Sequence, residues 1–375
     1  MTRVAIIHDW LTGMRGGESV LEAIIELFPT AELFTLICIP DKISPTLKQL
    51  KTHTSWLQKI PGAKRRYRHF LPWMPGMIEQ FDLSHFDLIL SSSHCVAKGI
   101  QKSKNSLHIS YIHAPMRYIW DRFDDYFGPG RTSWITRLGA HLLRKKLQTW
   151  DQKVSTPSRI DHILTNSQFI ASQIRNHYGR EAQVVYPFAH SERFTLPRKP
   201  ENYYLMVTAF APYKKVDIAI EAFNQLRLPL WIVGSGQDEI LLKNRSGPQI
   251  RFLGSTSNQA IAELYSKCKA LIFPGIEDFG ITPLEAMAAG APVIAYGEGG
   301  ARETLQENTG IFFTPQSSEA LISAVQIMES QSHLFPESAC RQRGKEFSRQ
   351  RFQKNFMKAI QEYWTASGKP PLTFN

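Results

Sequence analysis

The 375-residue sequence lacks several features that define large classes of proteins. No run of apolar residues approaches about eighteen, so we expect no membrane-spanning helix. Residues 1–7 lead directly into a strand pattern and show no long apolar core or small-residue cleavage site, so we expect no signal peptide. The cysteines have no metal-like spacing, which predicts cytosolic thiols at Cys38, Cys95, Cys268 and Cys340.

Acidic residues are too few to balance the basic ones. The net charge is +11 and the pI is about 9.4. Such a balance favours anionic partners, namely nucleic acid, phosphorylated ligands or an acidic membrane surface. No nucleic-acid-binding module is recognisable in the sequence, so we expect phosphorylated ligands or a membrane and no nucleic acid.

The hydrophobic pattern alternates between buried strands and amphipathic helices in both halves of the chain. Strands are predicted at Arg3 to His8, Glu32 to Leu36, Phe86 to Ser91, Leu107 to Ile112, Asp161 to Asn166, Gln183 to Tyr186, Tyr203 to Thr208, Leu230 to Val233, Ile250 to Leu253, Ala270 to Phe273, Val293 to Tyr296 and Ile311 to Phe313. The pattern predicts an α/β fold of two Rossmann-like domains that face a central cleft. The predicted parts are residues 1–190, a proline-containing linker at 191–202, a second domain at 203–350 and a final helical segment at 351–375.

The segment from Leu271 to Glu303 carries the clearest pattern of a ligand site. A buried strand ends at Pro274 and Gly275, and a helix is predicted to begin with Thr282 as its N-cap. Gly280 precedes this helix start, where free backbone N–H groups and the helix dipole favour an anion. The chemistry predicts that a phosphate-bearing ligand binds there.

Two carboxylates, Glu277 and Glu285, flank this predicted anion site. A carboxylate repels phosphate but accepts hydrogen bonds from sugar hydroxyls, which favours a ligand that carries both groups. A structural interpretation remains open. Glu285 is also the residue that would complete a capping box with Thr282, and Glu277 would then be a solvated loop residue.

The residues from Glu277 to Ala295 resemble the donor-site signature of the family-4 retaining glycosyltransferases, which have the GT-B fold. The resemblance implies that Glu285 binds the nucleotide ribose and that Glu277 lies against the donor sugar. It also implies that the last helix returns to the first domain. The backbone amides of the loop would hold the sugar and diphosphate at Phe279, Gly280, Ile281 and Thr282.

Two segments of the first half extend the resemblance. Gly16 and Gly17 lie between the first strand and first helix, where glycine lets a ligand approach the backbone, although a plain turn is the alternative. The run from His113 to Asp121 resembles the acceptor-domain loop of the mannosyltransferase-like branch. By resemblance, His113 contacts the donor sugar near the reacting carbon, and the acceptor side is shaped by Arg117, Trp120 and Asp121.

The second half supplies the remaining predicted donor contacts. Lys214 follows the first strand of the second domain, where a lysine neutralises a diphosphate leaving group. It matches the lysine of the family pattern, but Ala209 stands where that pattern has an arginine. Lys215 and Arg15 are candidate replacements, and a different position of the donor is the alternative. Gly234 lets a nucleotide approach the sheet edge. The segment with Phe252 and Leu253 resembles the one whose backbone contacts the base.

Two basic segments of the first half are candidates for binding an anionic membrane surface. Residues 59–77 interleave cations with aromatic residues, and residues 134–150 form a basic amphipathic helix. A charged surface loop and an ordinary domain helix are the alternatives for these two segments. We therefore expect a cytoplasmic protein that is peripheral on the inner face of the plasma membrane.

Together these features predict a retaining hexosyltransferase that uses no metal or cofactor, since Asp-x-Asp is missing from the sequence. The expected donor is a nucleoside-diphosphate sugar, with GDP-mannose as the specific prediction. The expected acceptor is lipid-linked or saccharide, in the synthesis of a surface polysaccharide such as lipopolysaccharide. Two alternatives remain: a sugar-nucleotide epimerase of related two-domain fold, and a non-catalytic subunit that binds a nucleotide sugar.

Overall fold

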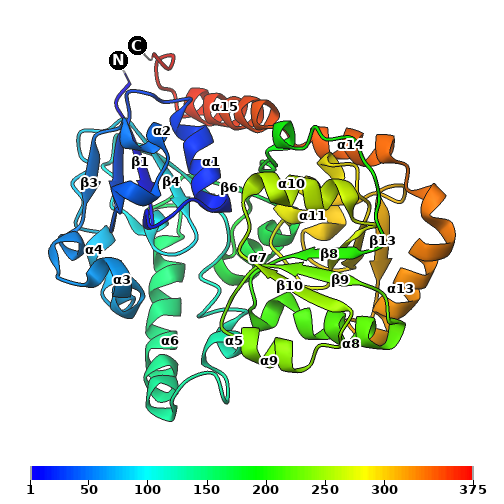
Figure 1. Ribbon diagram of the computed structural model, residues 1–375. Coiled ribbons are helices and arrows are strands. Elements are labelled where there is room, and N and C mark those ends of the chain that lie inside the picture. Colours follow the sequence, from blue (N-terminus) through cyan, green and yellow to red (C-terminus); the bar gives the residue numbers. More distant parts are fainter. Residues whose placement is uncertain (1, 374–375) are drawn as a thin grey trace. The chain divides into compact units, whose positions relative to one another are not determined.

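The computed structural model describes residues 2–373, which fold into two compact units (Figure 1). The first unit ends at Pro187 and is completed by the residues from Phe352 onward. The second unit is formed by Phe188–Arg351. Each unit contains one parallel β-sheet, as the alternating strand and helix pattern predicts.

The sheet of the first unit has seven strands in the order β3-β2-β1-β4-β5-β6-β7. The chain moves outward from β1 in one direction, then crosses back to place β4 on its other side, with Val4 opposite Leu88. This reversal point is where such sheets bind ligands. The strands are β1 (Val4–His8), β2 (Glu32–Thr35), β3 (Thr52–Thr54), β4 (Leu88–Ser93), β5 (Leu107–Ile112), β6 (His162–Thr165) and β7 (Gln183–Val184).

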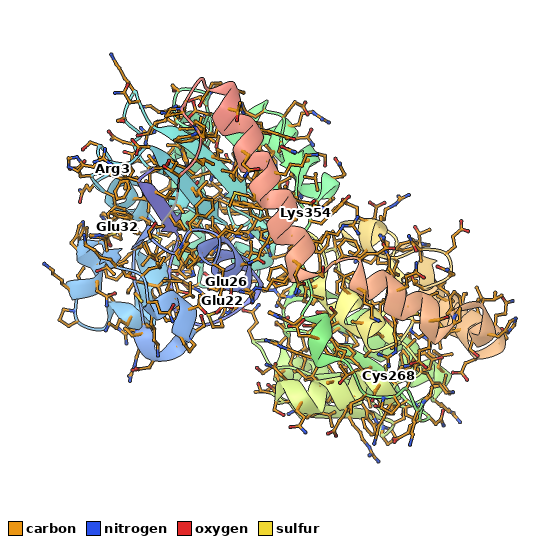
Figure 2. All side chains as sticks on the ribbon, turned by 90° about the horizontal axis from the view of Figure 1, so that it is seen from above. Arg3, Glu22, Glu26, Glu32, Cys268 and Lys354 are labelled. Carbon is orange, nitrogen blue, oxygen red and sulfur yellow. The ribbon has the colours of Figure 1, made fainter. Side chains whose placement is uncertain are left out.

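Helices of the first unit include one from the end of the chain. They are α1 (Gly16–Ile25), α2 (Pro45–Lys48), α3 (Ala63–Arg66), α4 (Met74–Ile78), α5 (Phe123–Phe127), α6 (Trp134–Val154), α7 (Gln168–Tyr178) and α15 (Arg349–Ala366). The rings of Phe352 and Phe356 in α15 pack on Tyr111 of β5. Gln353 joins α15 to α1 by donating to the Ala23 carbonyl (3.1 Å) and the Glu26 carboxylate (2.8 Å). Figure 2 labels Glu26 and also Lys354, which follows Gln353 in the sequence.

The sheet of the second unit has six strands in the order β10-β9-β8-β11-β12-β13. The strand order again reverses next to the first strand, between β8 and β11. Helices cover both faces of this sheet (Figure 1). The elements are β8 (Tyr204–Val207), α8 (Val216–Leu226), β9 (Leu230–Val233), α9 (Glu239–Asn244), β10 (Ile250–Gly254), α10 (Asn258–Lys267), β11 (Leu271–Phe273), α11 (Ile281–Ala288), β12 (Val293–Tyr296), α12 (Ala301–Thr304), β13 (Gly310–Phe313), α13 (Ser318–Gln331) and α14 (Glu337–Lys345).

Residues 191–202, predicted as a linker, belong to the second unit and pack against it. Phe194 is buried in its core beside Tyr265, with ring centroids 5.7 Å apart. The Arg198 guanidinium donates to the carbonyl of Lys269 (2.9 Å). The prolines indicate correctly that the segment is irregular, but its apolar and basic side chains attach it to the second unit.

Two expectations from composition concern the cysteines and the helices. Each of the four cysteines is a buried free thiol. Across residues 2–373, the helices fall short of the length and apolar character needed to cross a membrane.

Candidate nucleotide-sugar site

A pocket of about 380 Å³ lies within the second unit, where β8 and β9 end. Val207 closes β8 and Val233 closes β9, and both residues line the pocket. The carboxyl ends of parallel strands meet at this edge, which is where open α/β sheets bind ligands. The remaining lining residues are Thr208, Ala209, Lys214, Gly234, Ser255, Thr256, Ile261 and Thr282.

Glycines beside the pocket allow neighbouring backbone segments to approach closely. A Cβ on Gly234 would lie 1.8 Å from the carbonyl oxygen of Thr208, and the φ of Gly234 is 140°. A Cβ on Gly300 would lie 2.3 Å from Cα of Phe279, and the Gly300 N–H donates to the Glu277 carbonyl (2.8 Å). The loop after β12 therefore supports the loop that carries Glu277, and its glycine is required by packing.

Lys214 and Glu277, both predicted to contact the donor, form an ion pair with each other. Their side chains are 15% and 20% exposed, so water screens the pair only in part. The Lys214 ammonium also lies 5.1 Å from the centroid of the Tyr213 ring. The cation expected to meet a diphosphate thus has a carboxylate partner within its own unit.

The start of α11 differs from the prediction. Gly280 is the N-cap, with a left-handed φ of 88°, and no side chain caps the helix. The predicted capping box of Thr282 and Glu285 is therefore wrong. Gly280 adopts a conformation that other residues avoid, which lets the helix begin at Ile281, two residues before the predicted start at Pro283. Glu285 consequently has no capping role.

Glu285 is half-buried and lies beside Tyr265. Burial raises the pKa of Glu285 to about 7, while a hydrogen bond from the Tyr265 hydroxyl (3.4 Å) and the charge of Arg193 act in the opposite direction. A carboxyl group that titrates near neutrality can accept a hydrogen bond from a hydroxyl when ionised and donate one when protonated.

Four other predicted donor residues are not among the residues that line the pocket. Lys215 has a left-handed φ of 53° at the N-cap of α8. Phe279 is buried in the core against Phe347, so only its backbone remains for a ligand. Phe252 packs edge-on against Phe210, whereas the Leu253 side chain is exposed.

Ser255 and Thr256 line the pocket although the sequence-based prediction did not include them. They follow β10 directly and precede Ser257, whose hydroxyl caps α10. A hydroxyl-rich run immediately after a predicted strand is the pattern that would have identified them. Thr208, also missed, occupies the equivalent place after β8.

In the first unit, His113 lies directly after β5, and burial lowers its pKa well below the usual value, so the ring is neutral. Its Nε2 lies 2.8 Å from the Ser92 hydroxyl, and its carbonyl accepts from Asn166 (2.9 Å). Gly16 begins α1, and a Cβ on Gly17 would lie 3.9 Å from the His113 ring. The structure therefore brings Gly17 and His113, both predicted site residues, together.

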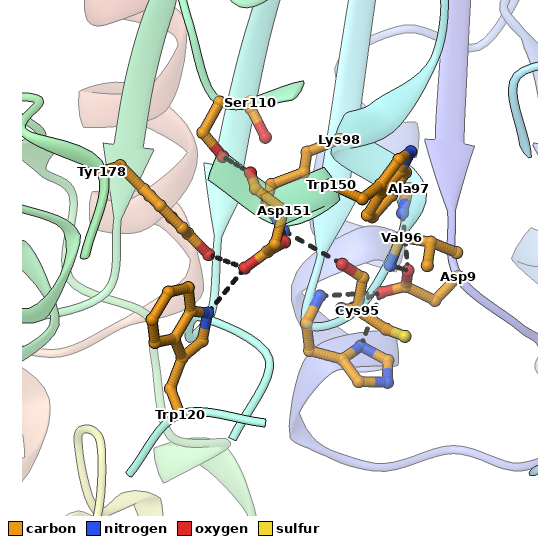
Figure 3. Close-up of polar contacts among 12 residues, drawn as sticks. Asp9, Cys95, Val96, Ala97, Lys98, Ser110, Trp120, Trp150, Asp151 and Tyr178 are labelled. Carbon is orange, nitrogen blue, oxygen red and sulfur yellow. Dashed lines mark hydrogen bonds and ion pairs between the residues drawn. The ribbon is translucent and has the colours of Figure 1, made fainter. Parts of the chain in front are cut away.

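Asp9 was not predicted, yet it organises the loop beside His113 (Figure 3). Its buried carboxylate accepts from the backbone N–H groups of residues 94–97 and from Nδ1 of His94 (3.0 Å). Although burial alone would raise the pKa of Asp9, the charge and hydrogen bond of His94 hold it well below the usual range. Asp9 is therefore ionised and fixes the turn after β4.

A second buried network supports the predicted acceptor-side loop (Figure 3). The Lys98 ammonium and the Asp151 carboxylate are fully buried and 2.5 Å apart. Asp151 also accepts from the Trp120 indole (2.8 Å) and the Tyr178 hydroxyl (2.6 Å). The polar atom of Trp120, predicted to shape the acceptor side, is thus used inside the unit, while Asp121 pairs with His177 (3.1 Å).

Two parallel-sheet α/β units, one of them with a pocket at its strand ends, define the GT-B class of glycosyltransferase folds. The fold of a sucrose-phosphate synthase from Thermosynechococcus elongatus is similar, with a TM-score of 0.71, 17% identity and coverage of 98% of this chain and 100% of that one. The predicted fold class is therefore confirmed.

Residues 189–347 match the family described as "Glycosyl transferases group 1". This range covers nearly the whole second unit, so the similarity to that family lies in the unit that contains the pocket. The match confirms the resemblance found in the residues from Glu277 to Ala295.

Curated relatives are similar over part of their length. The chain is 28% identical over 188 residues to the O-antigen chain mannosyltransferase RfbU of Salmonella typhimurium, covering 46% of this chain and 52% of that protein. It is 29% identical over 205 residues to the human alpha-1,3/1,6-mannosyltransferase ALG2, covering 44% and 49% respectively. The similarity thus spans about half the length of each relative.

Proposed function

We propose that the protein is a hexosyltransferase that takes mannose from GDP-mannose. The observation that carries this proposal is the pocket of a group 1 glycosyltransferase domain, lined by Lys214 and by Thr282 of α11. The names of the two mannosyltransferase relatives support mannose as the sugar. The guanine base is part of the proposal because GDP-mannose is the donor that we expect for a mannosyltransferase.

The residues of the pocket suit a sugar nucleotide in a specific way. We propose that the Lys214 ammonium and the backbone N–H groups at the start of α11 stabilise the diphosphate as its charge increases. Glu285 would accept from the ribose hydroxyls, and Glu277 from the hydroxyls of the sugar. For the diphosphate to pair with Lys214, Glu277 must release it, which frees the Glu277 carboxylate for the sugar.

The transfer itself would be a same-face displacement that retains the anomeric configuration. The bond between the sugar C1 and the diphosphate oxygen breaks while the acceptor oxygen bonds to C1. The acceptor proton passes to the leaving phosphate, so no enzyme carboxylate becomes covalently attached to the sugar. In this proposal the cations and backbone dipoles supply the charge stabilisation, and no metal ion is required.

The acceptor is proposed to be a saccharide or a lipid-linked saccharide of surface-polysaccharide synthesis, handled by a peripheral protein at the inner face of the plasma membrane. The O-antigen assignment of one relative supports the polysaccharide class. Two basic segments of the first unit, without acidic residues, support proximity to anionic lipid.

A donor screen tests the proposal. Incubation with GDP-mannose, UDP-glucose and UDP-galactose, followed by thermal unfolding, should single out GDP-mannose, because a ligand at about 100 times its Kd adds about 2.7 kcal/mol. Transfer of labelled mannose to a saccharide or lipid-linked acceptor should then follow. Stabilisation by a UDP-sugar alone would reject the donor assignment, and conversion of the donor without any acceptor would indicate an epimerase.

A non-catalytic subunit that binds a nucleotide sugar is the second candidate, and one observation favours it. Ala209 lines the pocket where the family pattern has an arginine, so one cation for the diphosphate is missing. Stabilisation by GDP-mannose without transfer to any acceptor would support this candidate. Acquisition of activity by Ala209→Arg would locate the defect at this position.

A further inference from the structure

The first half of α6 (Trp134–Val154) exposes a stripe of large apolar side chains. Trp134 is 74% exposed, Ile135 64%, Leu138 53% and Leu142 73%. Residues at spacings of three, four and seven lie on one face of a helix, so these four side chains form one continuous surface. Large contiguous apolar surfaces on soluble domains mark sites of interaction.

The opposite face of α6 is anchored, so the stripe cannot turn inward. Leu147, Asp151 and Val154 are buried. The Arg144 guanidinium donates to the carbonyls of Ile119 (2.8 Å) and Trp120 (3.1 Å). These contacts fix the rotation of the helix about its axis and leave the apolar stripe facing outward.

Basic residues are frequent in the part of the sequence that contains the stripe. Residues 126–150 contain five arginines and lysines and no acidic residue, with Lys145 and Lys146 exposed on the same side as the stripe. Residues 42–78 contain eight arginines and lysines and again no acidic residue. These two segments together carry more positive charge than the net +11 of the whole chain, so the rest of the chain is slightly acidic.

Residues 42–78 and 126–150, which contain the two basic segments 59–77 and 134–150, are neighbours in the first unit. Tyr67 and Met77 of the earlier segment share one hydrophobic cluster with Leu147 of α6. The Trp150 indole of α6 donates to Glu79, directly after α4 (3.1 Å). Figure 1 shows α3, α4 and α6 within this unit. Segments that are remote in the sequence thus pack against each other within the unit.

We propose that α6 docks the first unit on an anionic lipid bilayer. The side chains of Trp134, Ile135, Leu138 and Leu142 enter the interfacial region, and the flanking lysines and arginines bind the lipid headgroups. The charge favours lipid over a second copy of the chain, because self-association through the stripe would bring Lys145 and Lys146 of both copies together. This inference deepens the proposed membrane association and assigns it to a defined surface.

Vesicle co-sedimentation of the full chain tests the apolar contribution. The probes are phosphatidylcholine vesicles with and without phosphatidylglycerol, used without donor or acceptor, so the result does not depend on the proposed transferase activity. Leu138→Ser combined with Leu142→Ser should weaken binding to the anionic vesicles by about tenfold or more. The matched control is Ile240→Ser with Leu241→Ser on α9, which are 78% and 55% exposed and should leave binding unchanged.

A second pair of variants tests the cations. Lys145→Gln with Lys146→Gln should reduce binding by about tenfold, and added salt should have less effect on this variant than on the parent. Lys354→Gln with Lys358→Gln removes the same charge from exposed positions of α15 and should have little effect.

Three results would overturn the proposal. One is equal binding of the parent to neutral and anionic vesicles. Another is equal loss of binding in the α6 variants and in their matched controls. The third is a dimer in lipid-free solution that the Leu138 and Leu142 substitutions dissociate, which would identify a second copy as the occupant. Unchanged thermal unfolding of the variants, expected because the side chains are exposed, separates loss of binding from loss of folding.

Discussion

Lys214 forms an ion pair with Glu277, so a diphosphate bound as proposed would compete with a carboxylate of the protein for the same ammonium. Replacement of Glu277 by Gln removes this competitor and keeps the shape of the side chain. We expect the Kd for GDP to decrease, by about threefold to tenfold, because a part-buried pair interacts more strongly than a surface pair. Isothermal titration of GDP measures this change.

The turnover of the same Glu277→Gln variant should fall, although its affinity for GDP should rise. If the freed carboxylate contacts the sugar, kcat with the sugar nucleotide should fall by about tenfold or more. Glu298→Gln removes an exposed carboxylate from the neighbouring loop and should alter neither quantity. Weaker GDP binding by Glu277→Gln would contradict the proposed exchange of partners at Lys214.

The raised pKa of Glu285 predicts a specific dependence of the free energy of unfolding on pH. Its pKa is raised to about 7 in the folded protein, so folding favours the protonated carboxyl group. This contribution is complete below the ordinary pKa of about 4.5 and is lost as the pH rises through 7. Glu285→Gln should therefore stabilise the protein at pH 8, by at most about 3 kcal/mol, and have little effect at pH 4. Urea unfolding at both pH values measures the difference, and an equal effect at both would contradict a raised pKa.

At the scale of elements, the loop after β12 should control the position of the Glu277 loop. Gly300→Ala places a Cβ where Cα of Phe279 lies, so we expect a loss of about 1–3 kcal/mol in stability and weaker GDP binding. Gly297→Ala is the matched control, because its Cβ would meet no atom closer than 3.5 Å. Equal behaviour of the two variants in thermal unfolding and GDP titration would show that the close packing at Gly300 has no functional consequence.

The Lys98 and Asp151 pair connects the turn after β4 to α6, and through Trp120 it supports the loop after β5. Asp151→Asn leaves the buried Lys98 ammonium without its counter-ion and should cost about 3–5 kcal/mol. The double variant Lys98→Met, Asp151→Leu should recover part of this loss, although Trp120 and Tyr178 then lack their acceptor. Denaturant unfolding of the single and double variants gives the comparison, and a double variant that is no more stable than Asp151→Asn would contradict the pairing.

Sequence periodicity predicted the long apolar strands well, because burial on both faces leaves a nearly continuous run of apolar residues. β9 and β12 have the predicted bounds. The edge strand β3 reads Thr-His-Thr and has no such run, so it was missed. The start of α11 was misplaced because proline and threonine are common helix-start residues, whereas the left-handed Gly280 decides the start in three dimensions.

Residues of the candidate site were predictable where they come shortly after the end of a predicted strand. Lys214, Gly234 and Thr282 were expected and line the pocket. Asp9 and Asp151 were not, because their importance arises from partners 85 or more residues away for Asp9 and 27 to 53 residues away for Asp151. Sequence spacing contains no information on such pairings.

At the scale of the whole molecule, the predicted residues are divided between the two units. The candidate pocket belongs to the second unit, whereas His113 belongs to the first. His113→Ala should therefore leave the Kd for GDP unchanged while lowering kcat by about 10²–10³. His113→Asn, which keeps a polar group beside Ser92, tests whether the loss is structural. Equal changes in Kd and kcat would assign His113 a supporting role in folding, and no change in either would remove it from the site.

The return of α15 to the first unit has a consequence for the order of events during synthesis on the ribosome. The core around Tyr111 is completed only by Phe352 and Phe356, which are translated after all of residues 188–351. The second unit is thus available to fold as soon as its own residues have emerged, while the first unit still exposes the apolar surface that α15 will cover. We therefore expect the usual order, in which the amino-terminal domain matures first, to be reversed in this chain. A nascent chain that has passed Arg351 but not yet Trp364 is the stage at which chaperones have the most to protect.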